Sequence, residues 1–331
     1  MPNKVQHTNR LRVIRMDAIK VIEKDSDGKL FTAESFLNAL RASNPFWWNE
    51  KETTSEWIYR GQWDSKWKLL PAAWREDNSK LKPLKEKISK LKSPESPSVP
   101  IPEKELDFYK SINTEYQALI DFCKLAEDLG FQVPLVSDGP LKNGFLINSD
   151  GPANMQQHTF LAQHHGIPTR FIDWTKKPLI ATYFAVGREF RPAYDPESIA
   201  VCALNIERLK KVHGVKYNDS YLRPNVLKES NFKSEYIHSQ QGLFTNINSD
   251  SNSKGLKEFF LAEHRFPSLE DVLNLITEEK KIDKPILYKF VLPLKEVSQL
   301  LLLLDRENIS QAHLMPNLDK VSETVISRWK Y

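Results

Sequence analysis

The stretch from Gln157 to Phe190 constrains the fold most, because it crowds a dense group of polar residues between two segments that we expect to be buried. The first predicted helix is short and carries Leu161 and His165 on one face. The turn at residues 166–168 ends it, since glycine adopts many backbone angles and proline cannot continue a helix. Residues 178–186 begin with proline and are otherwise almost wholly apolar, which predicts a buried helix.

Between these two buried segments the chain gathers side chains that need hydrogen-bond partners. Buried polar groups are almost always hydrogen-bonded, so a group of this density is either a structural lock or a functional site. The residues concerned are Gln163, His164, His165, Thr169, Arg170, Asp173, Trp174 and Thr175.

The composition excludes several classes of protein. A chain of 331 residues forms one large or two modest domains, and its net charge of +4 is a mild bias compatible with an anionic ligand or nucleic acid. Cys123 and Cys202 alone provide no disulfide framework or zinc cluster and indicate a reducing compartment. The longest apolar run, residues 300–304, is too short to cross a bilayer, so we expect a cytoplasmic protein without a membrane partner.

Hydrophobic periodicity predicts strands and helices without internal repeats. We expect strands within residues 12–23, 57–62, 198–204, 236–245 and 284–292. We expect helices within residues 30–42 (with Thr32 as N-cap), 103–130, 207–212, 295–308 and 317–330. Residues 213–234 and 246–256 are polar and predict loops, and the Lys-, Glu-, Ser- and Pro-rich residues 76–104 predict a linker or surface excursion.

These elements predict a single α+β domain with a mixed or split β-sheet and surrounding helices. Residues 1–54 would form an N-terminal strand and helix packed on a main body of residues 55–331. The chain carries no glycine-rich phosphate loop of the P-loop or dinucleotide type, which argues against an ATPase or a Rossmann dehydrogenase.

Several blocks of the sequence resemble the FRG domain. The longest runs from Leu161 to Thr175 and reads LAQHHGIPTRFIDWT, and it is followed by Pro178-Leu179 and Tyr183-Phe184-Ala185. The other blocks are Tyr59-Arg60-Gly61, Leu69-Leu70-Pro71 with Arg75, Gln240 to Thr245, and Leu314 to Asp319. The resemblance covers residues 55 to 325 and implies membership of this family, which is named for its Arg-Gly motif and not for an activity.

A more distant resemblance is to the ADP-ribosyltransferase pattern, and it implies a fold of that type. In that pattern an arginine binds the phosphate or ribose of NAD, and a hydroxyl residue holds the nicotinamide ribose. An acidic residue on a late strand acts at the glycosidic bond. The matching positions here are Arg60, Thr175 and a residue within 238–241. Gln240 and Gln241 stand where the pattern has an acid. The resemblance therefore leaves open an ADP-ribosyltransferase, an NAD glycohydrolase or a protein that only binds NAD, in a bacterial toxin or phage-defence setting.

The chemistry of these residues agrees with an anionic nucleotide as ligand. A guanidinium fork suits two-point contact with a diphosphate, and Gly61 would let a ligand approach the backbone. We predict a cleft whose catalytic candidates are Arg60, His164, Asp173, Thr175 and Gln241. The candidates for binding NAD, as a substrate, are Arg60, Gly61, Gln62, Thr169, Arg170 and Thr175. No metal is expected, because adjacent histidines in a helix point in different directions.

Each feature also has a structural interpretation. Arg60 would then be a buried arginine paired with Asp173, or Asp173 and Trp174 would cap the helix that begins near Pro178. The aromatic residues are more often core than a stacking platform for bases. They are Trp57, Tyr59, Trp63, Trp67 and Trp74.

Two rival functions stay open at the level of sequence. One is a non-catalytic module that binds nucleic acid or a protein partner through a basic and aromatic surface. The other is a hydrolytic enzyme that acts on nucleic acid through His164 and His165.

Overall fold

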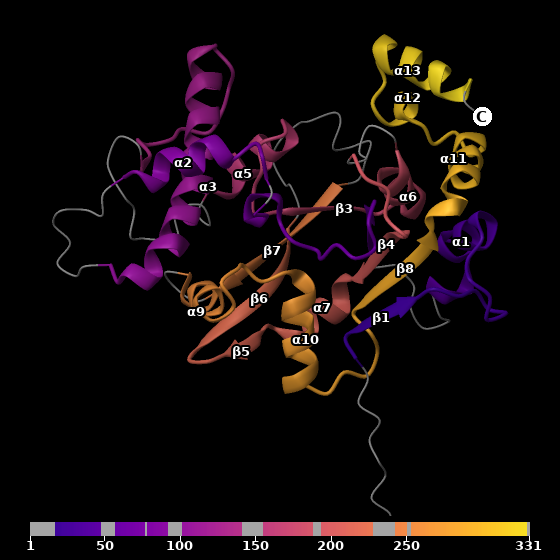
Figure 1. Cartoon of the computed structure of the whole chain (residues 1–331), viewed down its shortest axis with the longest axis horizontal. Helices are drawn as coiled ribbons and strands as arrows, with labels where there is room; N and C mark the ends of the chain where they lie inside the picture. The colour runs from indigo at the N-terminus through magenta and orange to yellow at the C-terminus, as the bar shows by residue number, and fades with distance from the viewer. Residues whose placement is uncertain are drawn as a thin grey trace, which may run out of the picture.

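A mixed β-sheet organises the computed structural model of this chain (Figure 1). The structure describes residues 17–47, 57–76, 78–91, 101–140, 155–187, 193–227, 242–249 and 253–329. Within these ranges the strand order is β1 (Ile19–Ile22), β8 (Leu287–Pro293), β4 (Ser198–Asn205), β2 (Trp57–Gln62), β3 (Ile172–Thr175), β7 (Gly242–Ser249), β6 (Ser220–Leu227) and β5 (Val215–Tyr217). Strands β1 and β8 run parallel and every other pair is antiparallel, which confirms an α+β fold with a mixed sheet.

Helices cover both faces of this sheet. They are α1 (Ala33–Leu40), α2 (Lys82–Ser89), α3 (Glu103–Asp128), α5 (Gln156–His164), α6 (Pro178–Val186), α7 (Ile206–Val212), α9 (Lys254–Glu263), α10 (Leu269–Glu279), α11 (Val297–Arg306), α12 (Gln311–Leu314) and α13 (Leu318–Arg328). Helices α1, α6 and α11 pack on one face, whereas α9 and α10 contribute to the apolar cluster on the other. Helices α2, α3 and α5 gather at one end of the molecule (Figure 1). No helix among the described residues is both long and apolar enough to cross a bilayer.

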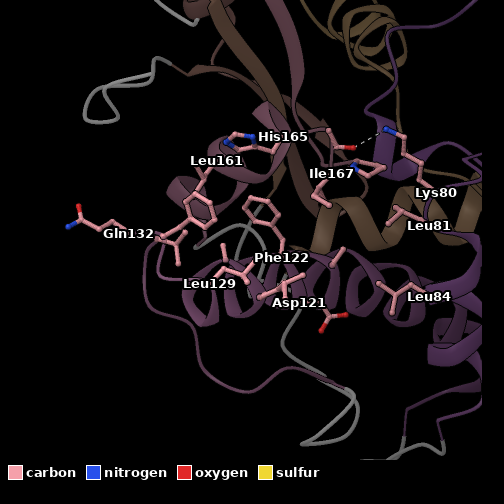
Figure 2. A pocket seen from close by; sticks show the side chains of 17 residues that line it. Lys80, Leu81, Leu84, Asp121, Phe122, Leu129, Gln132, Leu161, His165 and Ile167 are labelled. Atoms are coloured by element: carbon pink, nitrogen blue, oxygen red, sulfur yellow. Dashed lines mark hydrogen bonds between the residues drawn. The ribbon is translucent and has the colours of Figure 1, made fainter. Parts of the chain in front are cut away.

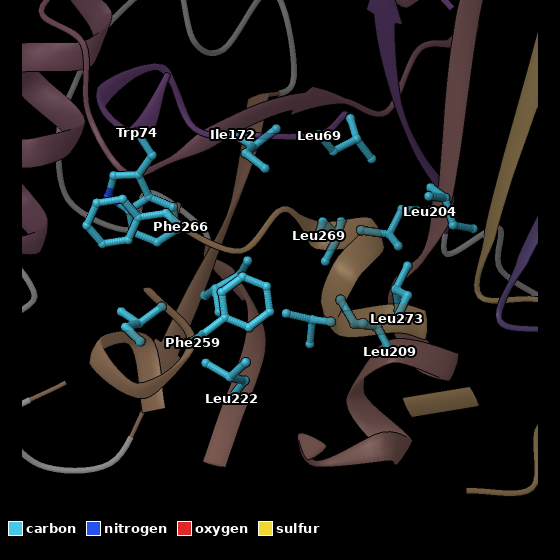
Figure 3. Close-up of a cluster of buried hydrophobic side chains, with 14 of the residues drawn as sticks. Leu69, Trp74, Ile172, Leu204, Leu209, Leu222, Phe259, Phe266, Leu269 and Leu273 are labelled. Atoms are coloured by element: carbon cyan, nitrogen blue, oxygen red, sulfur yellow. The ribbon is translucent and has the colours of Figure 1, made fainter. Parts of the chain in front are cut away.

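Strand β4 shows why the centre of the sheet reads as a continuous apolar run. Cys202 and Leu204 join the cluster on one face, and Val201 and Ala203 join the cluster on the other. A strand covered on both faces has no solvent-exposed side, so its sequence lacks the alternation of polar and apolar residues. The cluster that contains Cys202 and Leu204 is drawn in part in Figure 3. It joins Leu69 and Trp74 to residues of α9 and α10.

The N-terminal segment is attached to the sheet and to α11. Strand β1 forms the edge next to β8, with Ile19 opposite Leu287. Thr32 caps α1 as expected, since its side chain accepts from the Ser35 amide in a capping box. The Ala33 amide then donates to the Glu296 carboxylate at 3.1 Å.

Several sequence predictions need correction. The predicted loop over residues 213–234 is wrong for residues 215–227, because β5 and β6 form a hairpin there, and its residues 228–234 lie outside the described residues. The predicted loop over residues 246–256 is wrong at both of its ends, since β7 continues to Ser249 and α9 begins at Lys254, and its residues 250–252 lie outside the described residues. Helix α2 lies inside the predicted linker of residues 76–104. The small polar Ser220 is fully buried in β6, which disguises the alternating pattern.

Other predictions hold. Strand β2 and helix α6 have the expected bounds, and α3, α11 and α13 lie within the predicted ranges. Helix α7 begins one residue before its predicted range of 207–212. Residues 12–16 and 236–241 of two predicted strands lie outside the described residues.

Gly61 fixes how closely α6 packs on β2. A Cβ atom at this position would lie 2.0 Å from the Ala181 carbonyl oxygen and 2.5 Å from the Ala185 amide nitrogen. Backbone atoms of a packed helix cannot yield at that distance, so only glycine allows this contact.

We therefore predict that Gly61→Ala lowers the free energy of unfolding by about 2–3 kcal/mol, because α6 must move off the sheet. Gly139→Ala is the matched control, since its added Cβ would meet the Gln117 side-chain amide and not a backbone. Urea unfolding followed by circular dichroism measures both changes. A Gly61→Ala variant as stable as Gly139→Ala would contradict the packing argument.

Candidate functional site

The sheet is joined at its middle by a narrow contact between β2 and β3. Strand β2 pairs with β4 along its whole length, but it pairs with β3 only where Tyr59 lies opposite Thr175. Thr175 also lies opposite Gly242 of β7, so Tyr59, Thr175 and Gly242 form one row across three strands. Beyond this row β2 and β3 are not paired, and the Arg60 side chain reaches across to β3 there.

Arg60 connects the two strands through its side chain. Its Nη1 donates to the Asp173 carbonyl oxygen at 2.9 Å and lies 3.5 Å from Asp173 Oδ2. The Arg60 side chain is 23% exposed and that of Asp173 is 58% exposed. In the part of the chain that the structure describes, Nε and Nη2 of Arg60 have no hydrogen-bond partner. The predicted pairing of Arg60 with Asp173 is therefore present, but the guanidinium keeps two donors for a further group.

Asp173 belongs to a chain of hydrogen bonds that runs back into α5. Its Oδ1 accepts from the side-chain amide of Gln163 at 2.5 Å. The Gln163 Oε1 in turn accepts from the Thr169 hydroxyl, which itself accepts from the Phe171 amide at 3.2 Å. Thr169 is buried. This predicted ligand residue therefore orients Gln163, and through it Asp173, from the interior of the protein.

His164 lies at the C-terminal end of α5 and is exposed. Its ring lies edge-on to that of His165, with 5.1 Å between centroids. Partial burial and the neighbouring His165 lower the pKa of His164, although Asp173 acts in the opposite direction. The imidazole is therefore mainly neutral at neutral pH, where one ring nitrogen accepts a hydrogen bond.

Arg170 is the fully buried arginine of the chain's central stretch. Its Nε and Nη2 donate to the two carboxylate oxygens of Glu115 on α3, at 2.7 and 2.9 Å. The Arg170 side chain is 1% exposed and that of Glu115 is 2% exposed. We predicted Arg170 as a ligand residue, but this pair commits it to holding the segment before β3 against α3.

Three other predicted ligand residues also make internal contacts. Thr175 is buried and its hydroxyl accepts from the Lys177 amide at 3.1 Å, which organises the turn into α6. Gln62 is buried and its side chain lies between Lys68 and Cys202. The space where a ligand would approach Gly61 is filled by α6. Gln241 lies outside the described residues.

Two structural interpretations of the sequence are decided by these contacts. The N-cap of α6 is Lys177, with no side-chain cap, so the interpretation of Asp173 as a helix cap is wrong. The interpretation of the aromatic residues as core is confirmed for Trp57, Tyr59, Trp63 and Trp74, all of which are buried.

Sequence reasoning missed Glu115, although a signal was present. Glu115 lies three residues after Ile112 and four before Leu119, on the face of α3 that both apolar residues bury. An acidic residue on an apolar helical face needs a buried cationic partner. Arg170, in the polar stretch, is that partner.

Cys202 lies opposite Arg60 on β4, on the same face of the sheet, and is a candidate nucleophile there. Burial raises the pKa of its thiol to about 12, and the positive charges of Lys289 and Arg60 act against this rise without cancelling it. The thiol is therefore protonated and unreactive. Among the described residues, no three His, Cys, Asp or Glu side chains gather into a metal site.

The comparison with known families bears on this same region. Residues 143–193 match the model of the FRG domain. The match includes α5, β3 and α6, and with them Gln163, His164 and Asp173. The chain matches no curated protein and no solved structure.

We predict that Glu115→Ala lowers the free energy of unfolding by about 3–5 kcal/mol, because it leaves the Arg170 charge buried without a partner. Asp305→Ala is the control, since it removes an equally bidentate partner from Arg328 at the surface. That change should cost less than about 1 kcal/mol. Equal losses for the two variants in denaturant unfolding would show that burial does not set the strength of the Arg170–Glu115 pair.

Proposed function

We propose that this chain is an ADP-ribosyltransferase-like protein that binds NAD where β2 and β3 separate. The row of Tyr59, Thr175 and Gly242 across three neighbouring strands carries this proposal. The positions that resemble the transferase pattern lie on or directly beside this row. Arg60 follows Tyr59, Thr175 is in the row, and Gln241 precedes Gly242 in sequence. A toxin or phage-defence effector is the setting that we propose on the resemblance alone.

The unused donors of Arg60 support the binding of a diphosphate. A guanidinium donates two parallel hydrogen bonds to phosphate oxygens, and Nε and Nη2 form one such pair of donors. Because the Arg60 side chain is only 23% exposed, its interaction with an anion is less screened than that of a surface arginine. The exposed residues Lys176 and Lys177 follow Thr175 and add positive charge to this segment.

Asp173 and His164 would orient the rest of the ligand. Cleavage of the bond between nicotinamide and ribose builds positive charge on the sugar, which a nearby carboxylate stabilises. Asp173 is the exposed carboxylate beside Arg60. We therefore assign the stabilisation of the ribose charge to Asp173, because Gln240 and Gln241 stand where the transferase pattern has an acidic residue. The neutral imidazole of His164 would accept a hydrogen bond from the ligand.

NAD should raise the melting temperature of the full chain. At 100 times its dissociation constant a ligand stabilises the folded state by about 2.7 kcal/mol, which corresponds to a shift of several degrees. Arg60→Ala should abolish the shift, and Arg60→Lys should retain only part of it because lysine lacks the fork. Arg41→Ala, which removes an exposed arginine paired with Glu307, should leave the shift unchanged. Differential scanning calorimetry measures all four proteins.

No shift with NAD, or an undiminished shift in Arg60→Ala, would contradict the proposal. Binding of a polynucleotide that weakens steeply with salt would instead support the rival recognition module.

If the chain is an enzyme, it should release nicotinamide from NAD. Asp173→Asn should lower the rate by about 100-fold, because the amide cannot stabilise the charge on the ribose, while NAD still raises the melting temperature. Chromatography of nicotinamide measures the rate. A shift without any release of nicotinamide by the wild-type chain would identify a protein that binds NAD and does not process it.

A further inference from the structure

A pocket of about 640 Å³ lies between α2, α3 and α5 (Figure 2). Its walls include Leu84 of α2, Phe122 and Leu129 of α3, and Leu161 and His165 of the α5 region. Arg60 and Asp173 are not among its lining residues, so it is separate from the site between β2 and β3. Its volume falls within the range of about 300–1,000 Å³ that is typical of small-molecule sites.

The pocket opens onto an apolar patch of the surface. Leu129 is 68% exposed and Phe131 is 65% exposed, and both line the pocket. Leu125, which also lines it, is 62% exposed. Contiguous apolar side chains at the surface are costly to hydrate and typically mark a binding site.

A cationic side chain, Lys80, and the imidazole of His165 lie on one wall of this apolar pocket. The Lys80 ammonium donates to the Gly166 carbonyl at 3.1 Å, and it has no carboxylate partner among the described residues. His165 lies on the same wall, with its ring stacked at 6.0 Å from that of Phe122 (Figure 2). The acidic lining residue Asp121 belongs to the α3 wall, whereas Lys80 precedes α2, and its carboxylate accepts a hydrogen bond from the Gln117 side-chain amide at 2.6 Å. A ligand that complements these walls is apolar along its length and anionic at one end.

We propose that this pocket binds a small amphiphile with an anionic head and an apolar tail, of which a medium-chain carboxylate is the simplest form. The head lies between Lys80 and His165, and the tail covers Leu84, Phe122 and Leu129. The walls contributed by three helices enclose a single small ligand better than a flat apolar patch would. This inference is independent of NAD binding, because the two sites share no ligand residue.

Isothermal titration calorimetry of the full chain with sodium decanoate, at concentrations below the critical micelle concentration, tests the proposal. We expect saturable binding at one site. Lys80→Gln should raise the dissociation constant about tenfold, since a charge-assisted contact is lost. Lys82→Gln, a neighbouring lysine that does not line the pocket, should change it less than about twofold. The affinity for neutral 1-decanol should be the same in Lys80→Gln as in the wild type.

A second pair of variants tests the apolar walls without disturbing the core. Phe131→Asp should abolish decanoate binding, whereas Leu135→Asp should preserve it, because Leu135 is 82% exposed and lies outside the pocket. Circular dichroism should show both variants folded, since both residues are largely exposed. Absence of saturable binding by the wild type, or equal binding by the two variants, would overturn the proposal.

Sedimentation distinguishes a second occupant of the pocket. A wild-type dimer that Phe131→Asp converts to a monomer, and that does not bind decanoate, would mean that a second copy of the chain covers this surface. That result would also overturn the proposal.

Discussion

The buried ion pair of Arg170 and Glu115 is the interaction on which the arrangement of the candidate site depends. Two charges withdrawn from water are tolerated only when their geometry is good and their remaining polar atoms are used. Glu115 meets this condition, because Oε1 also accepts from the Arg170 backbone amide at 3.2 Å. One carboxylate thus holds both the side chain and the main chain of the segment that leads into β3. Asp173, three residues later, takes its position from this anchor.

Strand β2 is positioned by different contacts, and the site lies where the two systems meet. Gly61 lets α6 lie directly on β2, and β4 pairs with β2 along its whole length. The Arg60 guanidinium is therefore carried by a rigid strand, and the Asp173 carboxylate by a segment anchored to α3. Since the strands share only the pair of Tyr59 and Thr175, the Arg60 side chain and not a hydrogen bond between the two backbones connects them beyond that row. Such a gap between rigid elements suits the binding of a ligand.

The sequence predicts much of this fold. The amphipathic period of α3 indicates a helix, and the short length of the apolar run in β4 indicates a strand. Prediction fails where a small polar residue such as Ser220 occupies a buried strand position. The pairing of Arg60 with Asp173 is one of the interpretations that the sequence leaves open, but the internal roles of Arg170 and Thr175 are not among them. The role of Arg170 depends on a partner far away in sequence, since Glu115 lies 55 residues earlier. The role of Thr175 depends on the pleat and register of its strand. Hydrophobic periodicity carries no such information.

A crystal structure of the full chain with NAD tests the central claim most directly, because the claim is a statement about two atoms of one side chain. The account predicts that phosphate oxygens of the dinucleotide accept hydrogen bonds from Nε and Nη2 of Arg60 while Nη1 keeps its contact with the Asp173 carbonyl. Electron density for NAD away from the separation of β2 and β3, or an Arg60 side chain whose Nε and Nη2 donate only to protein atoms, would contradict it.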